Sequence, residues 1–434
     1  MRRLTLVLAS CALPLAALPA GAQQRSVTLA EALVLAERNA PAVVTARGNV
    51  RSAGAGVRAA WGQFLPTLSS TANYGSSTSD GPSRTDPITG EIISGSASSS
   101  SLSLGGNASV DLFTGFSRGA NLSSTRASRT EAEAALDFEQ SQSALQTTNQ
   151  FLQALQNADL VRVRSDAIRR AQEKLIIANA KLATRATTIA DSLQAVVDLT
   201  RAQLQLLTEE RNLADAEAKL ARLVGLDGRV AAVADSSLFR LAGISDTAAL
   251  MGEAQERAPS VIRAAAQVRT ARANVSIIRA NYLPRVTLSG RTSFAGSDRN
   301  SFTLFNSRSF DLGLSWPLFN GFTRERDLVI RQVALDAALA READERRRVG
   351  SELTSQLAAL SAAEQRARLT AQNLETARAS ARVQTERYRL GSINIEQLNQ
   401  AQDALSNAET DAVSARYDYL RAKAQIEAIL GRTL

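Results

Sequence analysis

The chain has 434 residues and a formal net charge of +8, from 50 Lys and Arg against 42 Asp and Glu. The basic residues are spread mostly singly, which argues against a nucleic-acid-binding surface. The sequence has no His and one Cys, Cys11. This composition excludes His-based triads, thiolate nucleophiles and His- or Cys-ligated metals, and we expect neither enzymatic activity nor a cofactor.

Residues 1–22 are predicted to be a signal peptide. Arg2 and Arg3 form a charged start, an apolar stretch follows to Leu18, and Ala20-Gly21-Ala22 is a small-residue cleavage site. Two alternatives remain, an N-terminal membrane anchor and lipidation at Cys11. In each case the chain is exported, and no later run of residues is apolar enough for a transmembrane helix.

The remainder consists of two tandem repeats, residues 23–243 and 244–434. Three motifs occur twice in the same order. The pairs are Ala40-Pro41-Ala42-Val43-Val44 with Ala258-Pro259-Ser260-Val261-Ile262, Phe64-Leu65-Pro66 with Tyr282-Leu283-Pro284, and Leu112-Phe113-Thr114-Gly115-Phe116-Ser117-Arg118 with Leu318-Phe319-Asn320-Gly321-Phe322-Thr323-Arg324. The first two pairs are 218 residues apart and the third is 206 residues apart, so one loop differs in length.

Each repeat is predicted to contain two strands, a long helix and a shorter helix. In the first repeat these are residues 66–76, 101–113, 116–184 and 188–224. In the second repeat they are residues 285–295, 308–319, 322–390 and 393–430. The long helices would extend about 100 Å, and the shorter helices carry Leu heptads typical of coiled coils.

The strands alternate apolar and polar residues, so each has one apolar face. A soluble sandwich is one interpretation; a membrane barrel is favoured by the export signal, the strand lengths and a cluster of aromatics at the strand bases. Those aromatics are Trp61, Phe64, Phe113, Phe116, Tyr282, Trp316, Phe319 and Phe322. Four strands leave open edges in lipid, so closure requires a dimer with eight strands or a trimer with twelve.

The duplicated Pro-helix-Leu-Pro-strand pattern, the Leu-Phe-x-Gly-Phe joint and the turn Arg387-Tyr388-Arg389-Leu390-Gly391-Ser392 resemble the TolC-like outer-membrane efflux proteins. The resemblance covers residues 25–432. It implies a homotrimer in outer-membrane lipid, with a twelve-stranded barrel above a periplasmic tunnel of coiled-coil helices. It also implies an exit duct that works with a periplasmic adaptor and an inner-membrane transporter.

The same resemblance assigns roles to the turns between the long and short helices. An adaptor would dock on a tip formed by Arg185, Thr187, Arg389, Leu390, Gly391 and Ser392, where Gly391 supplies a positive φ. An aperture would be lined by Asp191, Tyr388, Glu396 and Asn399, with Asn399 at a position that is often Asp in the family. Charge stabilisation at helix N-termini is an equally simple role for Asp191 and Glu396.

Two further expectations concern the aperture. Tyr388 is placed to donate a hydrogen bond to Asp191, and Asn399→Asp should strengthen block by divalent cations. An envelope-spanning structural or adhesive coiled-coil protein remains the alternative function. The exported substrate is not predicted, because a duct carries what its pump supplies.

Overall fold

A computed structural model describes residues 25–93, 97–235 and 247–434. The predicted signal peptide and Cys11 lie outside the described residues. The chain divides into two compact units that do not follow the two repeats, because each repeat contributes to both. We call residues 25–39, 146–235 and 363–421 the hairpin unit, and residues 40–93, 97–145, 247–362 and 422–434 the sheet unit.

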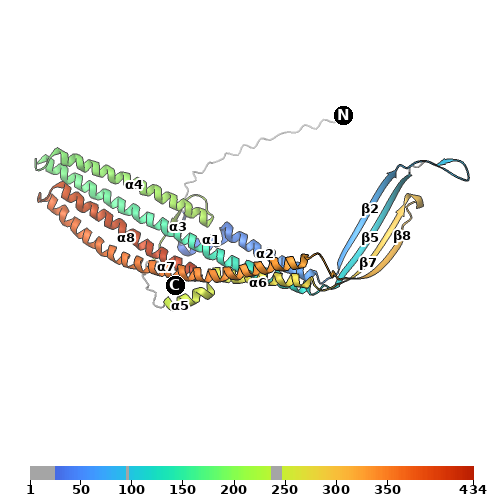
Figure 1. Cartoon of the computed structure of the whole chain (residues 1–434). Helices are drawn as coiled ribbons and strands as arrows, with labels where there is room; N and C mark the ends of the chain where they lie inside the picture. Colours follow the sequence, from blue (N-terminus) through green and yellow to red (C-terminus); the bar gives the residue numbers. More distant parts are fainter. Residues whose placement is uncertain (1–24, 94–96, 236–246) are drawn as a thin grey trace, which may run out of the picture. The chain divides into compact units, whose positions relative to one another are not determined.

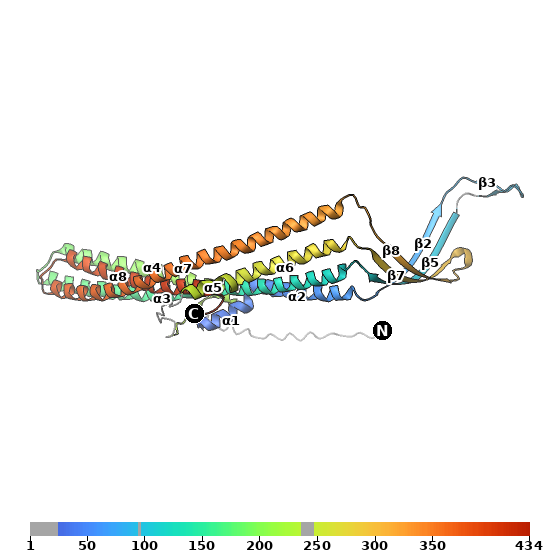
Figure 2. The ribbon, with the colours of Figure 1, turned by 60° about the horizontal axis from the view of Figure 1, so that its bottom comes forward.

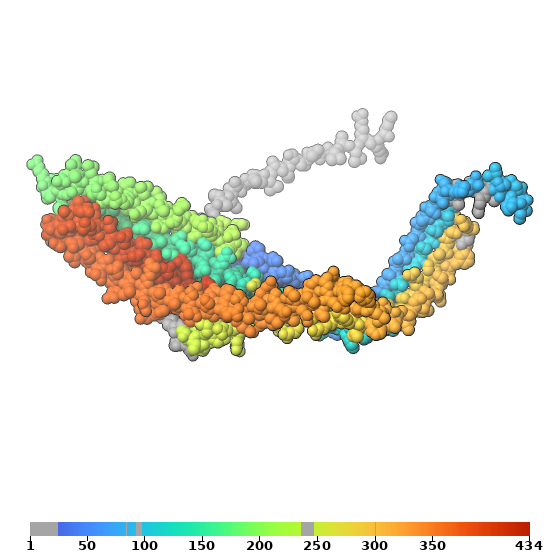
Figure 3. Space-filling model, in the orientation of Figure 1, coloured from blue at the N-terminus to red at the C-terminus, as the bar shows by residue number. Residues whose placement is uncertain are grey.

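The sheet unit contains a four-stranded antiparallel sheet with the order β2-β5-β7-β8 (Figure 1). The strands are β2 (Thr67–Ser79), β5 (Ala97–Phe113), β7 (Arg285–Ser297) and β8 (Phe305–Ser315). A small hairpin of β3 (Arg84–Thr85) and β4 (Ile92–Ile93) lies between β2 and β5. β2 and β8 form the two edges, which are the blue and the orange-yellow borders of the sheet in Figure 3.

The strand register places the apolar residues of all four strands on one face. Leu68, Ala108, Gly290 and Phe310 are aligned across the sheet, and Val110, Leu288 and Leu312 form a neighbouring row. Ser, Thr, Asn and Asp residues occupy the other face. Phe310, Leu312 and Leu314 are at least 70% exposed. Figures 1 and 2 show the helices of this unit beyond one end of the strands, so no described element of the sheet unit covers the apolar face.

Helices α2 (Pro41–Gly62), α5 (Thr247–Arg257) and α6 (Pro259–Ala280) belong to the sheet unit, with the first parts of α3 (Ser117–Ala183) and α7 (Thr323–Arg389). Pro41 and Pro259 occupy the first helical turn, where the missing N–H costs nothing. Gly431 has a φ of +71°, and a Cβ there would lie 2.7 Å from the ring of Pro259. The start of α6 and the end of the chain are therefore closely packed.

The predicted strand 308–319 is displaced in the structure, where β8 begins at Phe305 and ends at Ser315. Pro317 cannot donate a ladder hydrogen bond, so Trp316 and Phe319 lie beyond the strand. The long helices begin at Ser117 and Thr323, each one residue after a Phe with positive φ. The shorter helices begin at Ile189 and Ile395, because residues up to Thr188 and Asn394 belong to the turns.

The hairpin unit contains α1 (Leu29–Asn39), α4 (Ile189–Val224), most of α8 (Ile395–Leu430), and the later parts of α3 and α7. A short parallel pair, β1 (Arg25–Val27) and β6 (Val230–Ala232), joins its ends. The heptad residues of α8 are packed inward: Leu398, Leu405, Tyr419 and Ile426 are at most 5% exposed, although Ile426 belongs to the sheet unit. Among the described helices, none is long and apolar enough to cross a membrane.

Candidate functional site

The two turns between long and short helices have the same backbone geometry, 206 residues apart. Arg185 has a φ of +58° and Gly391 a φ of +79°. Ala186 N–H donates to the Lys181 carbonyl at 2.8 Å, and Ser392 N–H donates to the Arg387 carbonyl at 2.8 Å. This is the Schellman arrangement that satisfies the last carbonyls of a helix. The expected positive φ at Gly391 is present, and Arg185 adopts the same conformation without being glycine.

The residues predicted for adaptor docking are accessible. Arg185, Arg389, Leu390, Gly391 and Ser392 are exposed, and Leu390 is 72% exposed. Thr187 is half-buried, and its hydroxyl donates a hydrogen bond to Asp191 Oδ2. A large exposed apolar side chain beside two arginines is a surface suited to contact with another protein.

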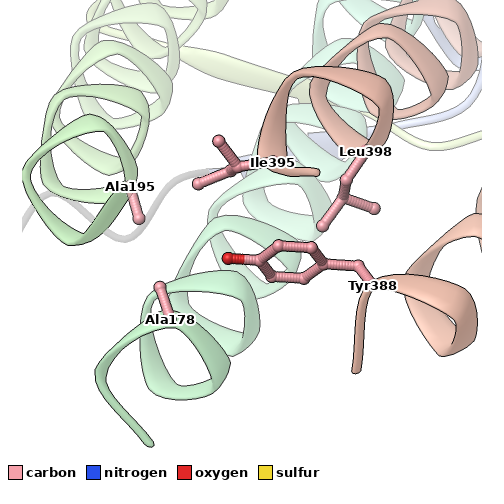
Figure 4. Packing of buried hydrophobic residues seen from close by; sticks show 5 residues of the cluster. All are labelled: Ala178, Ala195, Tyr388, Ile395 and Leu398. Atoms are coloured by element: carbon pink, nitrogen blue, oxygen red, sulfur yellow. The ribbon is translucent and has the colours of Figure 1, made fainter. Parts of the chain in front are cut away.

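Behind these turns lies a small apolar cluster contributed by four helices. Tyr388 at the end of α7 is 1% exposed and packs with Leu398 and Ile395 of α8, and with Ala178 of α3 and Ala195 of α4. Figure 4 shows the Tyr388 ring pointing from α7 toward α3 and α4. Lys181 Nζ donates to the Tyr388 carbonyl at 2.7 Å and lies 4.2 Å from the ring centre. Tyr388 therefore joins the two helical hairpins.

The predicted hydrogen bond from Tyr388 to Asp191 is wrong. Among the described residues the Tyr388 hydroxyl has no hydrogen-bond partner, and Asp191 accepts from Thr187. Asp191 is still close enough to act electrostatically. Burial, and secondarily the negative charge of Asp191, raises the pKa of the Tyr388 hydroxyl above its usual value near 10.

A polar cavity of about 470 Å³ lies among α3, α4 and α8 of the hairpin unit, and we call it the tip cavity. Glu396 and Asn399 both line it, so the structure brings these two predicted aperture residues together. Asp191 and Tyr388 are not among its lining residues. Charged residues of both signs surround the cavity: Arg164, Arg170, Lys174, Arg201, Asp198 and Asp403.

Lys174 is the most buried cation of the cavity, with a side chain 4% exposed. Its ammonium donates to Asp198 Oδ2 of α4 and to Asn399 Oδ1 of α8, each at 2.7 Å. A second link from α3 to α8 is the paired contact of Arg170 with Glu409, at 2.8 and 3.3 Å. Asn399 is therefore a ligand of a buried ammonium, and a carboxylate at this position would face Lys174.

In the sheet unit, the predicted aromatic residues gather at the junctions of strands and helices. Phe113 and Phe116 form an edge-to-face pair with ring centres 5.4 Å apart, and Phe319 and Phe322 repeat it at 5.5 Å. Trp61 contacts Phe64, and Trp316 donates to the Tyr282 carbonyl at 3.2 Å. Most remain exposed, including Phe116 at 71% and Phe322 at 70%. Exposed aromatics in this position are typical of a membrane interface.

One arginine stabilises each junction. Arg118 donates to the carbonyls of Gln63 and Leu112 at 3.2 and 3.3 Å, and its guanidinium lies 5.0 Å from the Phe64 ring centre. In the second repeat, Arg324 donates to the carbonyls of Pro317 and Leu318 and lies 4.7 Å from the Tyr282 ring centre. The planar guanidinium suits this combination of carbonyl binding and ring stacking.

Comparison with known families settles the classification. The profile described as "Outer membrane efflux protein" matches residues 32–226 and 250–432. The chain belongs to the outer membrane efflux protein family. Members of this family are outer-membrane channels and not enzymes.

The curated and structural relatives are TolC-like channels. The pyoverdine export outer membrane protein OpmQ of Pseudomonas aeruginosa is 27% identical over 295 residues, which are 65% of this chain and 60% of OpmQ. The match thus spans about 60% of the length of this curated relative. The fold is also that of CusC, with a TM-score of 0.79, 18% identity and coverage of 95% and 94% of the two chains. VceC of Vibrio cholerae gives a TM-score of 0.73, 17% identity and coverage of 93% and 96%.

The sequence did not reveal the roles of Lys174, Asp198, Arg118 and Arg324 in this family member. Lys174 and Asp198 are equally distant from the turn centred at residue 186, so the symmetry of a helical hairpin could have paired them. Arg118 and Arg324 were part of the repeated joint motif, and their recurrence at the same position was the available signal.

Proposed function

We propose that this protein is the outer-membrane exit duct of a tripartite efflux or type I secretion system. Three copies would close a twelve-stranded barrel, and the helices would continue it as a periplasmic tunnel. The observation that carries this proposal is the single-layer sheet with an exposed apolar face and two open edges. An apolar face needs an apolar environment, and open strand edges are not tolerated in lipid.

A second surface supports association between copies. Helix α4 has an exposed apolar stripe of Ile189, Leu193, Val196, Leu204 and Leu207, each at least 45% exposed. These residues recur at helical spacing on a side of α4 different from that of Ala195, Ala202 and Leu220, which are buried within the chain. Contact with α7 or α8 of a neighbouring copy would bury the stripe.

The adaptor would dock at the turns of Arg185 and Gly391. Their shared geometry gives one chain two similar docking elements, so a trimer would present six to the adaptor. The substrate would be determined by the inner-membrane transporter. OpmQ is a pyoverdine export protein, and the cargo of this chain would be a molecule small or extended enough to pass such a duct.

Cysteine crosslinking tests the closure of the barrel. β2 and β8 are separated by β5 and β7, about 14 Å at normal strand spacing, beyond the roughly 7 Å limit for a disulfide. Thr71→Cys combined with a Cys scan of Ser307, Ser309 and Asp311 should therefore form a bond only between copies. One register should give a covalent trimer in purified outer membranes.

Thr71→Cys combined with Gly105→Cys is the matched control, because Gly105 of β5 lies directly opposite Thr71 of β2 within the same chain, and a Cβ at Gly105 would lie 3.0 Å from Thr71 Oγ1. This pair should give only crosslinked monomer. If no β2–β8 pair yields a species larger than a monomer, the proposed trimeric barrel is wrong.

A further inference from the structure

The apolar face of the sheet carries one charged residue among the described strand positions, Arg308 of β8. The register aligns it with Thr292 of β7, Gly106 of β5 and Ser70 of β2. Every neighbouring row on this face is apolar or uncharged. In a lipid-facing position, an arginine without a partner is costly, and it requires an anion or access to the membrane surface.

The strand that would neighbour β8 in a closed barrel supplies no such anion. Across the described part of the chain, Arg308 forms no hydrogen bond or ion pair. β2, Thr67–Ser79, contains no Asp or Glu, and the first acidic residue after it is Asp80. Within the barrel wall, the charge of Arg308 is therefore uncompensated by protein.

A hollow of about 480 Å³ lies directly beside Arg308 on the same face. Gly106 and Ala108 have little or no side chain and form its floor, while Leu68 and the Phe310 ring, which lies over Gly290, also line it. The hollow is thus mainly apolar, with a guanidinium at its edge. This combination fits an amphiphile whose acyl chain fills the hollow and whose anionic group contacts the arginine.

The position along the strand indicates the membrane leaflet. Arg308 lies three residues from Phe305, where β8 begins at the end of the sheet away from the helices. At about 3.4 Å per residue this is about 10 Å along the strand. On the proposed function, the helices are periplasmic, so Arg308 reaches toward the outer surface.

We infer that Arg308 and the adjoining hollow bind a phosphate-bearing lipid of the outer leaflet. The guanidinium would hold the phosphate through two parallel N–H donors, and one acyl chain would lie over Gly106 and Ala108, beside the Phe310 ring. This inference rests on the proposed outer-membrane duct and adds a lipid-binding site to its outer wall.

Native mass spectrometry of the purified full chain tests the site with two lipids that differ only in the phosphate. Dioleoyl phosphatidic acid should remain bound to the trimer, and dioleoylglycerol should not. Arg308→Gln should weaken retention of phosphatidic acid about tenfold, and Arg308→Lys should retain part of it. Arg285→Gln is the matched control, because Arg285 lies on the polar face of β7, opposite Ser315, and does not line the hollow, so this variant should leave retention unchanged.

A second variant tests the hollow separately from the charge. A Cβ at Gly106 meets only the Thr292 methyl at 3.5 Å, so Gly106→Val fits the backbone and occupies the hollow. It should reduce lipid retention while the trimer persists.

Several outcomes would overturn the inference: equal binding of both lipids, equal effects of Arg308→Gln and Arg285→Gln, or displacement of the lipid by millimolar inorganic phosphate. Loss of the bound lipid in Asp80→Asn but not in Arg308→Gln would also contradict the inference, because the phosphate would then not be held by Arg308. The same spectra report the trimer mass. A trimer without bound lipid refutes only the lipid site, whereas absence of the trimer refutes the proposed function.

Discussion

The contact of Lys174 with Asn399 is expected to hold α8 against α3 in the hairpin unit, and Asn399→Leu removes it selectively. Lys174 keeps Asp198 at 2.7 Å in this variant, so the α3–α4 contact survives. A hydrogen bond to a buried charged group contributes about 1.5–3 kcal/mol. We therefore expect the local opening free energy of α8 near residues 395–406 to fall by about 2 kcal/mol.

Lys174→Met should lower the stability more than Asn399→Leu does, because the Asp198 carboxylate, whose side chain is 12% exposed, would lose the Lys174 ammonium as its ion-pair partner. Removing one partner of a buried pair costs about 3–5 kcal/mol. Asp198 retains Gln194 at 2.9 Å and Arg201 at 3.7 Å, which favours the lower end of that range. Adding Asp198→Leu to Lys174→Met should recover part of the loss, since no buried charge remains unpaired.

Amide hydrogen exchange, followed by mass spectrometry of the assembled protein, measures these local openings. A loss of about 2 kcal/mol corresponds to roughly thirtyfold faster exchange in α8, with the strands of the sheet unit as an unchanged internal reference. Gln402→Leu is the control, because Gln402 lines the same cavity and has no hydrogen bond within the described residues. Equal protection of α8 in Asn399→Leu, Gln402→Leu and the parent protein would refute the reasoning.

Three other predictions concern single residues. Leu312→Arg, on the apolar face, should cost about 2–4 kcal/mol and reduce insertion into outer membranes, measured as heat-resistant trimer, whereas Asp311→Arg on the polar face should insert normally. Gly391→Val should cost about 1–2 kcal/mol from its φ of +79° and impair pump-dependent export, whereas Gly391→Asn should be tolerated better; unaltered export by the Val variant would contradict a docking role. Because its raised pKa favours the protonated form, Tyr388 contributes stability that is complete below pH 10 and is lost as pH rises through its folded-state pKa. Tyr388→Phe should abolish this alkaline loss in thermal melts without destabilising the protein at pH 7, since the hydroxyl has no partner in the described structure; destabilisation by about 1 kcal/mol or more would show that the hydroxyl is bonded.

Local sequence features were sufficient for the sheet and the helices. Alternating residues predict the strands, seven-residue repeats predict the shorter helices, and runs without Pro allow the long ones. These features were insufficient at the junctions. Phe116, Arg185 and Phe322 adopt positive φ values that are unusual for residues other than glycine, and tertiary contacts override that local preference. Tyr388 illustrates a second limit, since its position near Asp191 was anticipated but the direction of its hydroxyl depends on the packing of four helices.

The tip cavity shows a third limit. Glu396 and Asn399 were predicted from the family resemblance to line an aperture, and that role stays a prediction; the structure adds that both line a cavity within one chain. Charged side chains of α3 and α4 surround that cavity. How close they come to Glu396 and Asn399 depends on how the helices are aligned with one another, and the residue pattern of one helix does not determine this alignment. Asn399→Asp is therefore expected to strengthen the link to Lys174 and to change divalent-cation block less than Glu396→Gln.

The two repeats differ in length by twelve residues between the Leu-Pro motif and the Gly-Phe joint, and the structure assigns this difference to the ends of the strands away from the helices. The β2–β5 connection carries the small β3–β4 hairpin, whereas β7 and β8 are joined by residues 298–304. Both joints nevertheless keep the same aromatic pair and the same arginine. The connection at the ends of the strands away from the helices can thus differ in length without altering the joints. We therefore expect a peptide inserted near Gly90, in the longer β2–β5 connection, to be tolerated.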